Sequence, residues 1–137
     1  MTENINTHIT IMLIDDDEDD RKLFAAELQE LDPSVKLITA EDGIEAFLSL
    51  EDESQRLPDF ILLDLNMPKK TGFEVLAEIK NDELLKNIPV IIYTTSINKN
   101  EKEETINHGA ISWITKTASK EELRKIISEM LEMYKSR

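Results

Sequence analysis

Acidic, hydroxyl and amine side chains follow short apolar segments of this 137-residue sequence. Aspartate occupies each of positions 15–17, and Asp64, Thr94 and Lys116 follow later apolar segments. If these side chains met in the folded chain, the carboxylates would repel one another unless a cation lay between them. Carboxylate oxygens with no histidine or cysteine among them favour Mg²⁺ over zinc or copper. The residue types therefore predict a magnesium site.

A magnesium ion held by one or two carboxylates and several waters normally serves to bind phosphate. Lys116 would offer a positive charge to a phosphoryl oxygen, and Thr94 would offer a hydrogen bond from its hydroxyl. A carboxylate can itself accept a phosphoryl group and become an aspartyl phosphate. Such a transfer needs little beyond in-line positioning and neutralisation of charge. We therefore expect phosphoryl chemistry if the fold brings these residues together.

The surrounding pattern predicts the strands and helices that would position them. Apolar runs rich in β-branched residues occupy residues 9–14, 35–39, 60–63, 90–93 and, more weakly, 111–114. They are continuous rather than alternating, which is typical of strands buried on both faces of a sheet. Segments with helical spacing separate them, and three of these carry an apolar stripe that should face the core. The stripes are Phe24, Leu28 and Leu31; Ile44, Phe47 and Leu48; and Leu123, Ile126, Ile127, Met130, Leu131 and Tyr134.

Capping signals mark the starts of four predicted helices, because a capping residue is followed three positions later by glutamate. The pairs are Asp42 and Glu45, Thr71 and Glu74, Asn98 and Glu101, and Ser119 and Glu122. The strand–helix order repeats five times, which predicts an α/β fold with a five-stranded parallel, doubly wound sheet. Ligands of such folds bind outside the carboxyl ends of the strands, where the polar residues lie. We expect one domain over residues 1–137, with a short polar tail at residues 1–7.

At these residues the chain resembles the receiver domain of bacterial two-component response regulators, which has a (βα)5 flavodoxin-like fold. The resemblance runs from about Ile9 to Tyr134. The family's motifs appear in order: Ile14-Asp15-Asp16, residues 58–68 around Asp64, residues 72–76, Pro89-Val90, Thr94, and Gly109-Ala110 ahead of Lys116. One acidic pair would be a weak signal, whereas the complete ordered set is specific.

The resemblance implies a function and a set of site residues. Asp64 would accept a phosphoryl group from a partner histidine kinase. Asp16 and Asp64 would bind Mg²⁺ through their side chains, and Asn66 through its backbone carbonyl. Asp15 would act through a water molecule or hold the cluster in place.

The resemblance also implies how the phosphorylated state would be sensed. Thr94 and Lys116 would contact the phosphoryl group. Trp113 matches the family's switch aromatic, whose rotamer follows the movement of Thr94, although packing alone would equally explain a tryptophan there. The face formed by the fourth helix (about residues 98–107), the fifth strand and the fifth helix would report the state. The family's usual Lys-Pro pair is here Lys116-Thr117, and we predict a trans bond because a cis bond is costly without proline.

Residues 65–72, with the Lys69-Lys70 pair, and the Thr-Thr-Ser run at 94–96 resemble the small receivers that partner bacterial phytochromes. This likeness implies a stand-alone response regulator without an output domain. The protein would not be an enzyme, since it would catalyse only its own phosphorylation and dephosphorylation. A phosphorylation-independent dimer or scaffold is the alternative. A homodimer would use Ile111, Trp113 and the exposed side of the fifth helix.

The composition bears on which partners the protein can bind and on where in the cell it is located. The net charge of −13 argues against nucleic acid binding, which needs a basic footprint. No apolar run approaches the roughly 20 residues needed to span a bilayer, and the N-terminus lacks the pattern of a secretion signal. We therefore expect a cytoplasmic protein with no membrane contact. His8 and His108 are not expected to be ligands.

Residues 17–20 are all acidic, and they are predicted to form a solvated helix start, favoured by the helix dipole, rather than further metal ligands. An EF-hand calcium loop beginning at Asp15 is excluded by its own pattern. The glycine that such a loop requires would be Asp20, and its closing glutamate would be Ala26.

Overall fold

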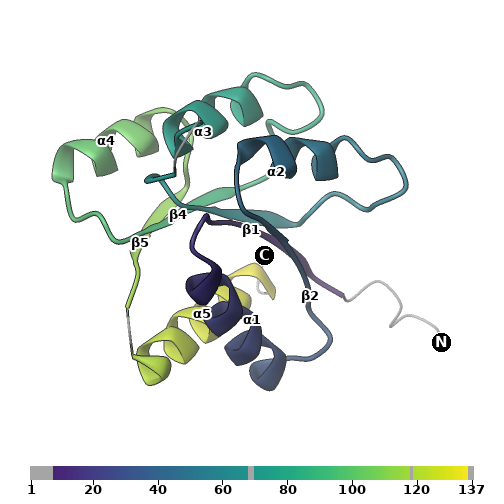
Figure 1. Ribbon diagram of the computed structural model, residues 1–137, viewed down its shortest axis with the longest axis vertical. Helices are drawn as coiled ribbons and strands as arrows, with labels where there is room; N and C mark the ends of the chain where they lie inside the picture. Colours follow the sequence, from purple (N-terminus) through teal and green to yellow (C-terminus); the bar gives the residue numbers. More distant parts are fainter. Residues whose placement is uncertain (1–7, 68–69, 118, 136–137) are drawn as a thin grey trace.

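The computed structural model describes residues 8–67, 70–117 and 119–135, and five strands alternate with five helices along this part of the chain. In Figure 1 the strands form a central layer with helices on both sides. The bounds, in chain order, are β1 (Thr10–Ile14), α1 (Glu18–Leu31), β2 (Lys36–Ala40), α2 (Gly43–Leu50), β3 (Phe60–Leu63), α3 (Gly72–Lys80), β4 (Val90–Thr94), α4 (Lys99–Asn107), β5 (Ser112–Thr115) and α5 (Lys120–Lys135).

All five strands belong to one parallel sheet with the order β2-β1-β3-β4-β5. Because β1 pairs with both β2 and β3, the chain first adds a strand on one side of β1 and then continues on the other side. In a doubly wound sheet this reversal opens a crevice at the carboxyl ends of the two central strands. The predicted parallel, doubly wound sheet is confirmed, and the reversal places its crevice between β1 and β3.

Alternate residues of the central strands supply two separate cores. Met12 and Ile14 of β1 pack with residues of α2 and α3 on one face of the sheet. Ile11 and Leu13 of the same strand pack with residues of α1 and α5 on the other face. Figure 1 shows the corresponding layers, with α2, α3 and α4 over the first face and α1 and α5 over the second.

Two predictions about burial are wrong, the second of them in part. The strands β2 and β5 form the edges of the sheet, so they are not buried on both faces, and Ala40 is the one fully buried residue of the two. In α2 the predicted stripe is correct only at Phe47, which packs against the core, because Ile44 and Leu48 are 58% and 68% exposed. The small Ala46 and the last residue Leu50 are buried instead, which lets this short helix approach the sheet closely.

The predicted helix starts are confirmed. Asp42, Thr71 and Asn98 cap α2, α3 and α4, and the Thr71 cap is a complete capping box with Glu74. Ser119 Oγ accepts a hydrogen bond from the backbone N of Glu122 at the start of α5, at 3.2 Å. The stripe of α5 also faces the core, through the buried side chains of Leu123, Ile127, Met130 and Leu131.

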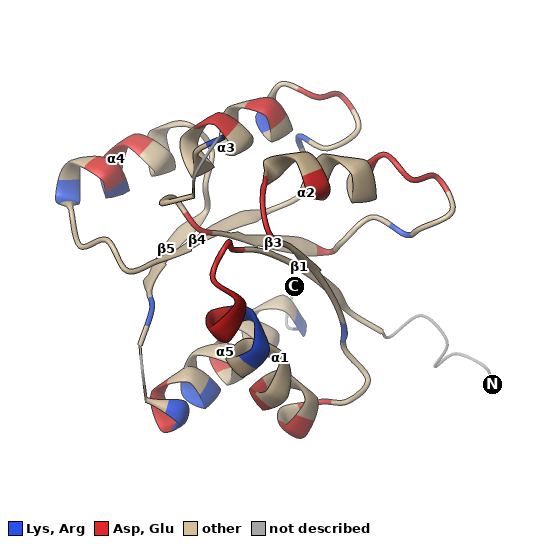
Figure 2. Cartoon of the chain, viewed as in Figure 1, with Lys and Arg blue, Asp and Glu red and all other residues tan. Residues whose placement is uncertain are grey.

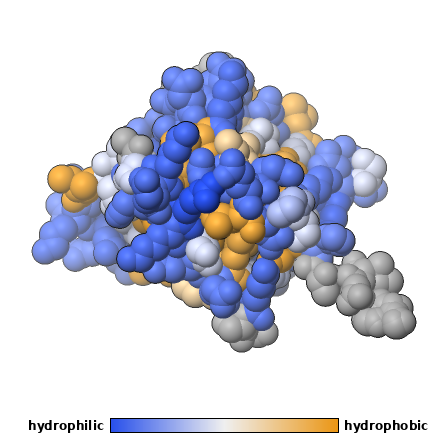
Figure 3. Space-filling view, turned by 90° about the horizontal axis from the view of Figure 1, so that it is seen from below, coloured by the Kyte–Doolittle hydropathy of each residue, from blue (hydrophilic) through white to orange (hydrophobic). Residues whose placement is uncertain are grey.

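Figure 3 views the molecule from the side on which α1 and α5 lie. Hydrophilic residues cover most of this face and surround a hydrophobic area near its middle. Among the helices described, none combines the length and the apolar character that a bilayer span requires.

Candidate functional site

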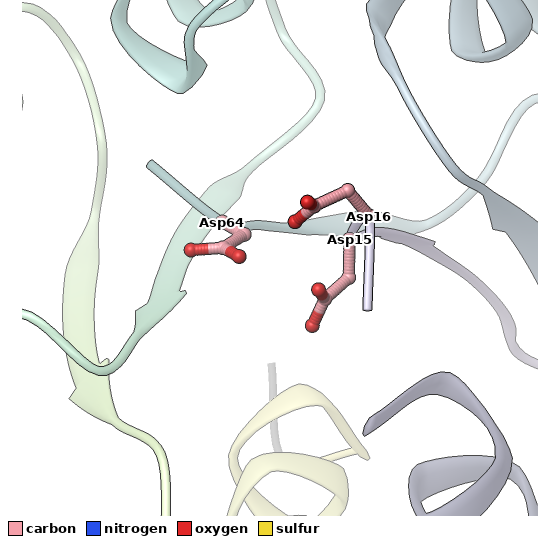
Figure 4. Close-up of side chains that lie close together, drawn as sticks. All are labelled: Asp15, Asp16 and Asp64. Atoms are coloured by element: carbon pink, nitrogen blue, oxygen red, sulfur yellow. The ribbon is translucent and has the colours of Figure 1, made fainter. Parts of the chain in front are cut away.

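Three carboxylates meet where β1 and β3 end. Asp15 and Asp16 follow β1, and Asp64 follows β3; the register pairs Ile14 with Leu63 and so aligns the two strand ends. The backbone N of Asp64 donates to the carbonyl of Ile14 at 3.0 Å, which fixes this alignment. Each of the three aspartates has a carboxylate oxygen within 4.8 Å of those of the other two, and Figure 4 shows them gathered at this edge. The group has the composition and spacing of a site for a divalent cation.

The three carboxylates differ in their access to solvent. Asp15 is completely buried and Asp64 is 5% exposed, whereas Asp16 is exposed. A ligand arriving from solvent would therefore meet Asp16 and the edge of Asp64 before it met Asp15. Asp15 is held from within the fold, because its Oδ1 accepts a hydrogen bond from the backbone N of Asp17 at 3.0 Å.

Lys116, just beyond β5, brings one positive charge into the cluster. Its Nζ lies 2.7 Å from Asp15 Oδ2 and 3.3 Å from Asp64 Oδ2. The backbone N of Lys116 donates to the carbonyl of Thr94 at 2.8 Å, which continues the pairing of β4 and β5 to this point. The lysine side chain is only 8% exposed. Its bond to Thr117 is trans, as predicted, since no described peptide bond is cis.

Burial and charge act in opposite directions on the ionisable groups here. Burial raises the pKa of the Asp15 carboxyl to about 6, although hydrogen bonds from Lys116 and from the backbone of Asp17 partly oppose it. Burial disfavours the Lys116 ammonium, but hydrogen bonds to Asp15 and Asp20 outweigh it and raise the pKa of that lysine above its ordinary value. Burial also raises the pKa of the neighbouring Tyr93 to about 12. The acidic groups outnumber the one ammonium, so a divalent cation would be electrostatically favoured.

Thr94 and Asn66 form a second, neutral part of the site. Thr94 ends β4 and is completely buried. Its Oγ1 accepts a hydrogen bond from Asn66 Nδ2 at 3.5 Å and another from the backbone N of Ser96 at 3.4 Å. The backbone N of Asn66 in turn donates to Asp64 Oδ1 at 3.2 Å. The hydroxyl is thus linked through Asn66 to the carboxylate at the end of β3.

Trp113 lies on β5, where it pairs with Ile92 of β4. Its side chain is partly buried and packs against the core between the sheet and α2 and α3. The packing interpretation is therefore confirmed, and the proposed switching role stays a prediction.

The structure corrects the prediction for one of the four acidic residues at 17–20. Asp17 caps α1 by accepting a hydrogen bond from the backbone N of Asp20, as a helix start should. Asp20, however, is not simply solvated, because its Oδ2 lies 2.8 Å from Lys116 Nζ. Figure 2 shows this acidic segment running from the end of β1 into the first turn of α1. The sequence analysis did not predict the contact of Asp20 with Lys116. A usable signal was that Asp20 is the third residue of a helix that starts next to the site.

Two residues of the motifs that carry the resemblance, Pro68 and Lys69, lie outside the described residues. Lys70 is described, and it forms an ion pair with Glu78 and lies 5.6 Å from the centre of the Phe47 ring. It is therefore directed at α2 and α3.

Comparisons of this chain with known families, sequences and structures all identify response regulators as its relatives. The family model for the response regulator receiver domain matches residues 11–128. Response regulator Rcp1 of Synechocystis sp. is 35% identical over 131 residues, which is 93% of this chain and 89% of Rcp1. The crystal structure of the phosphorylated cyanobacterial phytochrome response regulator RcpA has 38% identity and a TM-score of 0.86, covering 95% of this chain and 96% of that one. The Mn²⁺-bound form of Rcp1 has 36% identity and a TM-score of 0.79, covering 89% and 91%.

Proposed function

Because the chain belongs to the response regulator receiver domain family, we propose that it accepts a phosphoryl group from a histidine kinase on Asp64. The observation that carries this assignment is the convergence of Lys116 with Asp15 and Asp64 at the carboxyl edge of the sheet. In this role the protein would catalyse only its own phosphorylation and dephosphorylation. The complete set of acidic residues, threonine and lysine favours this function over a phosphorylation-independent scaffold.

We assign Mg²⁺ as the metal of this site. Asp16 and Asp64 would bind it through their side chains, Asn66 through its backbone carbonyl, and Asp15 through a water molecule. The surplus of carboxylates over ammonium groups fits a divalent cation, and the relative Rcp1 has a Mn²⁺-bound form. When bound, the ion would neutralise charge on the phosphoryl oxygens.

The chain's own residues would carry out the remaining steps. A carboxylate oxygen of Asp64 attacks the phosphorus of a phosphohistidine, the phosphorus–nitrogen bond breaks, and its electron pair leaves with the imidazole nitrogen. The ammonium of Lys116, already 3.3 Å from Asp64 Oδ2, would turn to a phosphoryl oxygen. The hydroxyl of Thr94 would donate a hydrogen bond to another.

The partner kinase is proposed to be of the phytochrome type. RcpA, a phytochrome response regulator, shares 38% of its residues with this chain over nearly the whole length of both. Phosphotransfer from candidate kinases to this protein would identify the partner directly.

The central experiment is incubation with Mg²⁺ and a small phosphodonor, followed by intact mass measurement. We expect the wild-type protein to gain one phosphoryl group and Asp64→Asn to gain none, because an amide oxygen is a poor nucleophile. Asp16→Ala should take up phosphate more slowly at the same Mg²⁺ concentration. Asp19→Asn is the matched control, since it removes a carboxylate from an exposed position of the nearby helix. Full phosphorylation of Asp64→Asn would move the acceptor to another residue.

We also propose that the α4-β5-α5 face mediates self-association. Three large apolar side chains of this region are exposed: Ile97 at 84%, Ile106 at 40% and Ile111 at 54%. Burial of such side chains in an interface would remove apolar surface from water. Light scattering should detect a dimer at high concentration, and Ile111→Glu should weaken it. A monomer in the presence and absence of a phosphoryl analogue would contradict the proposal.

A further inference from the structure

Lys116 has a third carboxylate partner that the phosphoryl site does not require. Asp20 Oδ2 lies 2.8 Å from Lys116 Nζ, as close as Asp15 within 0.1 Å and closer than Asp64 at 3.3 Å. The contact joins residues 96 positions apart in the sequence. The Asp20 side chain is 37% exposed and the Lys116 side chain 8% exposed. Solvent therefore reaches the carboxylate of this ion pair but hardly reaches the ammonium.

The start of α1 is built to present Asp20 at this point. Asp17 caps the helix through the backbone N of Asp20. One turn along, Arg21 Nη1 donates to the backbone carbonyl of Asp15 at 2.8 Å. The first turn of α1 is therefore tied both to its own cap and to the end of β1. These contacts fix the position of Asp20 relative to Asp15 at the end of β1. A helix start that was only solvated would not need them.

A lysine ammonium has three N–H donors on a flexible four-carbon stem. In this site Nζ donates hydrogen bonds to Asp20 Oδ2 at 2.8 Å and to Asp64 Oδ2 at 3.3 Å, and it forms an ion pair with Asp15 Oδ2 at 2.7 Å. Without the contact to Asp20, the ammonium would be free to shorten its 3.3 Å contact with the Asp64 carboxylate. The tighter ion pair would neutralise more of the charge on the attacking oxygen and would have to break before transfer.

We propose that Asp20 is a positioning residue that keeps the Lys116 ammonium from closing further on Asp64 and directs it to the place where the phosphoryl oxygens arrive. The inference rests on the proposed function, because it assigns a rate-setting role at the same site. Asp20 touches neither the acceptor nor the phosphoryl group in this role. It acts through the lysine.

The test compares Asp20→Asn with Asp19→Asn at saturating Mg²⁺, using a small phosphodonor. Each variant removes one carboxylate from the first turn of α1, but Asp19 is exposed and is not among the ion-pair partners of Lys116, which are Asp15, Asp20 and Asp64. We expect Asp20→Asn to phosphorylate roughly three- to tenfold more slowly than wild type, the range of a partly screened ion pair. Asp19→Asn should equal wild type or be slightly faster, because it repels the anionic donor less. Equal rates for the two variants, or a faster Asp20→Asn, would overturn the proposal.

Two further measurements separate positioning from a general effect on structure. In a Lys116→Met background, Asp20→Asn should have no additional effect on the rate, because interacting residues give non-additive changes. An additional slowing there would show that Asp20 acts by another route. In the unphosphorylated protein, the NMR signal of the Lys116 ammonium protons should be retained in Asp19→Asn and broadened in Asp20→Asn. An unchanged signal in Asp20→Asn would count against the contact.

The NMR measurement needs no phosphoryl transfer, so it distinguishes two failures. If the wild type takes up no phosphate, the proposed function fails, while the NMR comparison still reports whether Asp20 holds the lysine. If the wild type is phosphorylated but the two aspartate variants behave alike, the proposed function stands and the role of Asp20 is wrong.

Discussion

The helices α3 and α4 have the same length of nine residues and cover the same face of the sheet, yet they are held very differently. Gly72, Val75, Leu76 and Ile79 of α3 are buried, whereas Thr105 is the one buried residue of α4. Both helices have a side-chain cap at the start. Caps decide where a helix begins, but buried apolar area decides how firmly it is attached. Of the two, α4 can therefore shift at the lower cost in free energy.

The two helices are also joined to the site in different ways. Gly72 opens α3 directly against the loop after β3, where a Cβ atom would lie 2.6 Å from the Cα of Leu65. This close backbone approach fixes α3 to the segment that carries Asp64. In contrast, α4 is connected through side chains: Ser96 Oγ donates to Glu101 of α4, and the backbone N of Ser96 donates to Thr94 Oγ1. A movement of the Thr94 hydroxyl would therefore be transmitted through Ser96 to α4, which of the two helices shifts at the lower cost in free energy.

The largest expected effect comes from truncating the same residue type in each helix. Ile79 is completely buried in α3, and Ile106 is 40% exposed in α4. Ile79→Ala should lower the free energy of unfolding by about 2–5 kcal/mol, and Ile106→Ala by less than about 1 kcal/mol. Urea denaturation measures both. Similar losses for the two variants would show that α4 is anchored as firmly as α3.

A smaller effect should appear when the connection to α4 is cut at Thr94. The chain has a single tryptophan, Trp113, so its fluorescence reports on β5 alone. Phosphorylation should change this fluorescence in the wild type, and Thr94→Ala should abolish the change while leaving the protein able to take up phosphate. The loss of the two long hydrogen bonds should cost only about 1 kcal/mol of stability. A full fluorescence response in Thr94→Ala would show that the change at Trp113 does not require the Thr94 hydroxyl.

The remaining predictions concern pH and the buried carboxylate of Asp15, at the carboxyl edge of the sheet. Because burial raises the pKa of Asp15 from 3.8 to about 6, the folded chain binds a proton between these pH values that the unfolded chain has released. Stability without metal should therefore fall as the pH rises from about 4 to about 6. Thermal unfolding in the presence of a chelator should show this fall in the wild type relative to Asp15→Asn.

Mg²⁺ competes with the same proton, so its affinity should weaken as the pH falls below about 6, the pKa of Asp15. Titration of Mg²⁺ at pH 5 and pH 7 measures this change. An affinity that does not depend on pH over this range would show that Asp15 is already ionised in the metal-free protein.

Local signals were enough to predict most elements and the residues that end them. The capping pairs gave the starts of α2, α3, α4 and α5, since a cap depends on contacts within four residues. The stripe of α5 was correct because sixteen residues show the helical period repeatedly. The stripe of α2 was correct only at Phe47 because eight residues offer only two turns, and the choice between Ile44 and Ala46 depended on how closely the helix approaches the sheet.

The sequence by itself determined which residues end each strand, and therefore which side chains can meet at the carboxyl edge of a parallel sheet. Asp15, Asp64 and Lys116 were identified in this way. Only the tertiary structure decided the strand order, which makes β1 and β3 neighbours and leaves β2 and β5 as edges. It also decided the contact of Asp20 with Lys116, because an ion pair between distant residues depends on how α1 packs beside the end of β5. Periodicity and capping describe interactions within a few residues, whereas strand order and ion pairs across elements arise from long-range packing that no local pattern records.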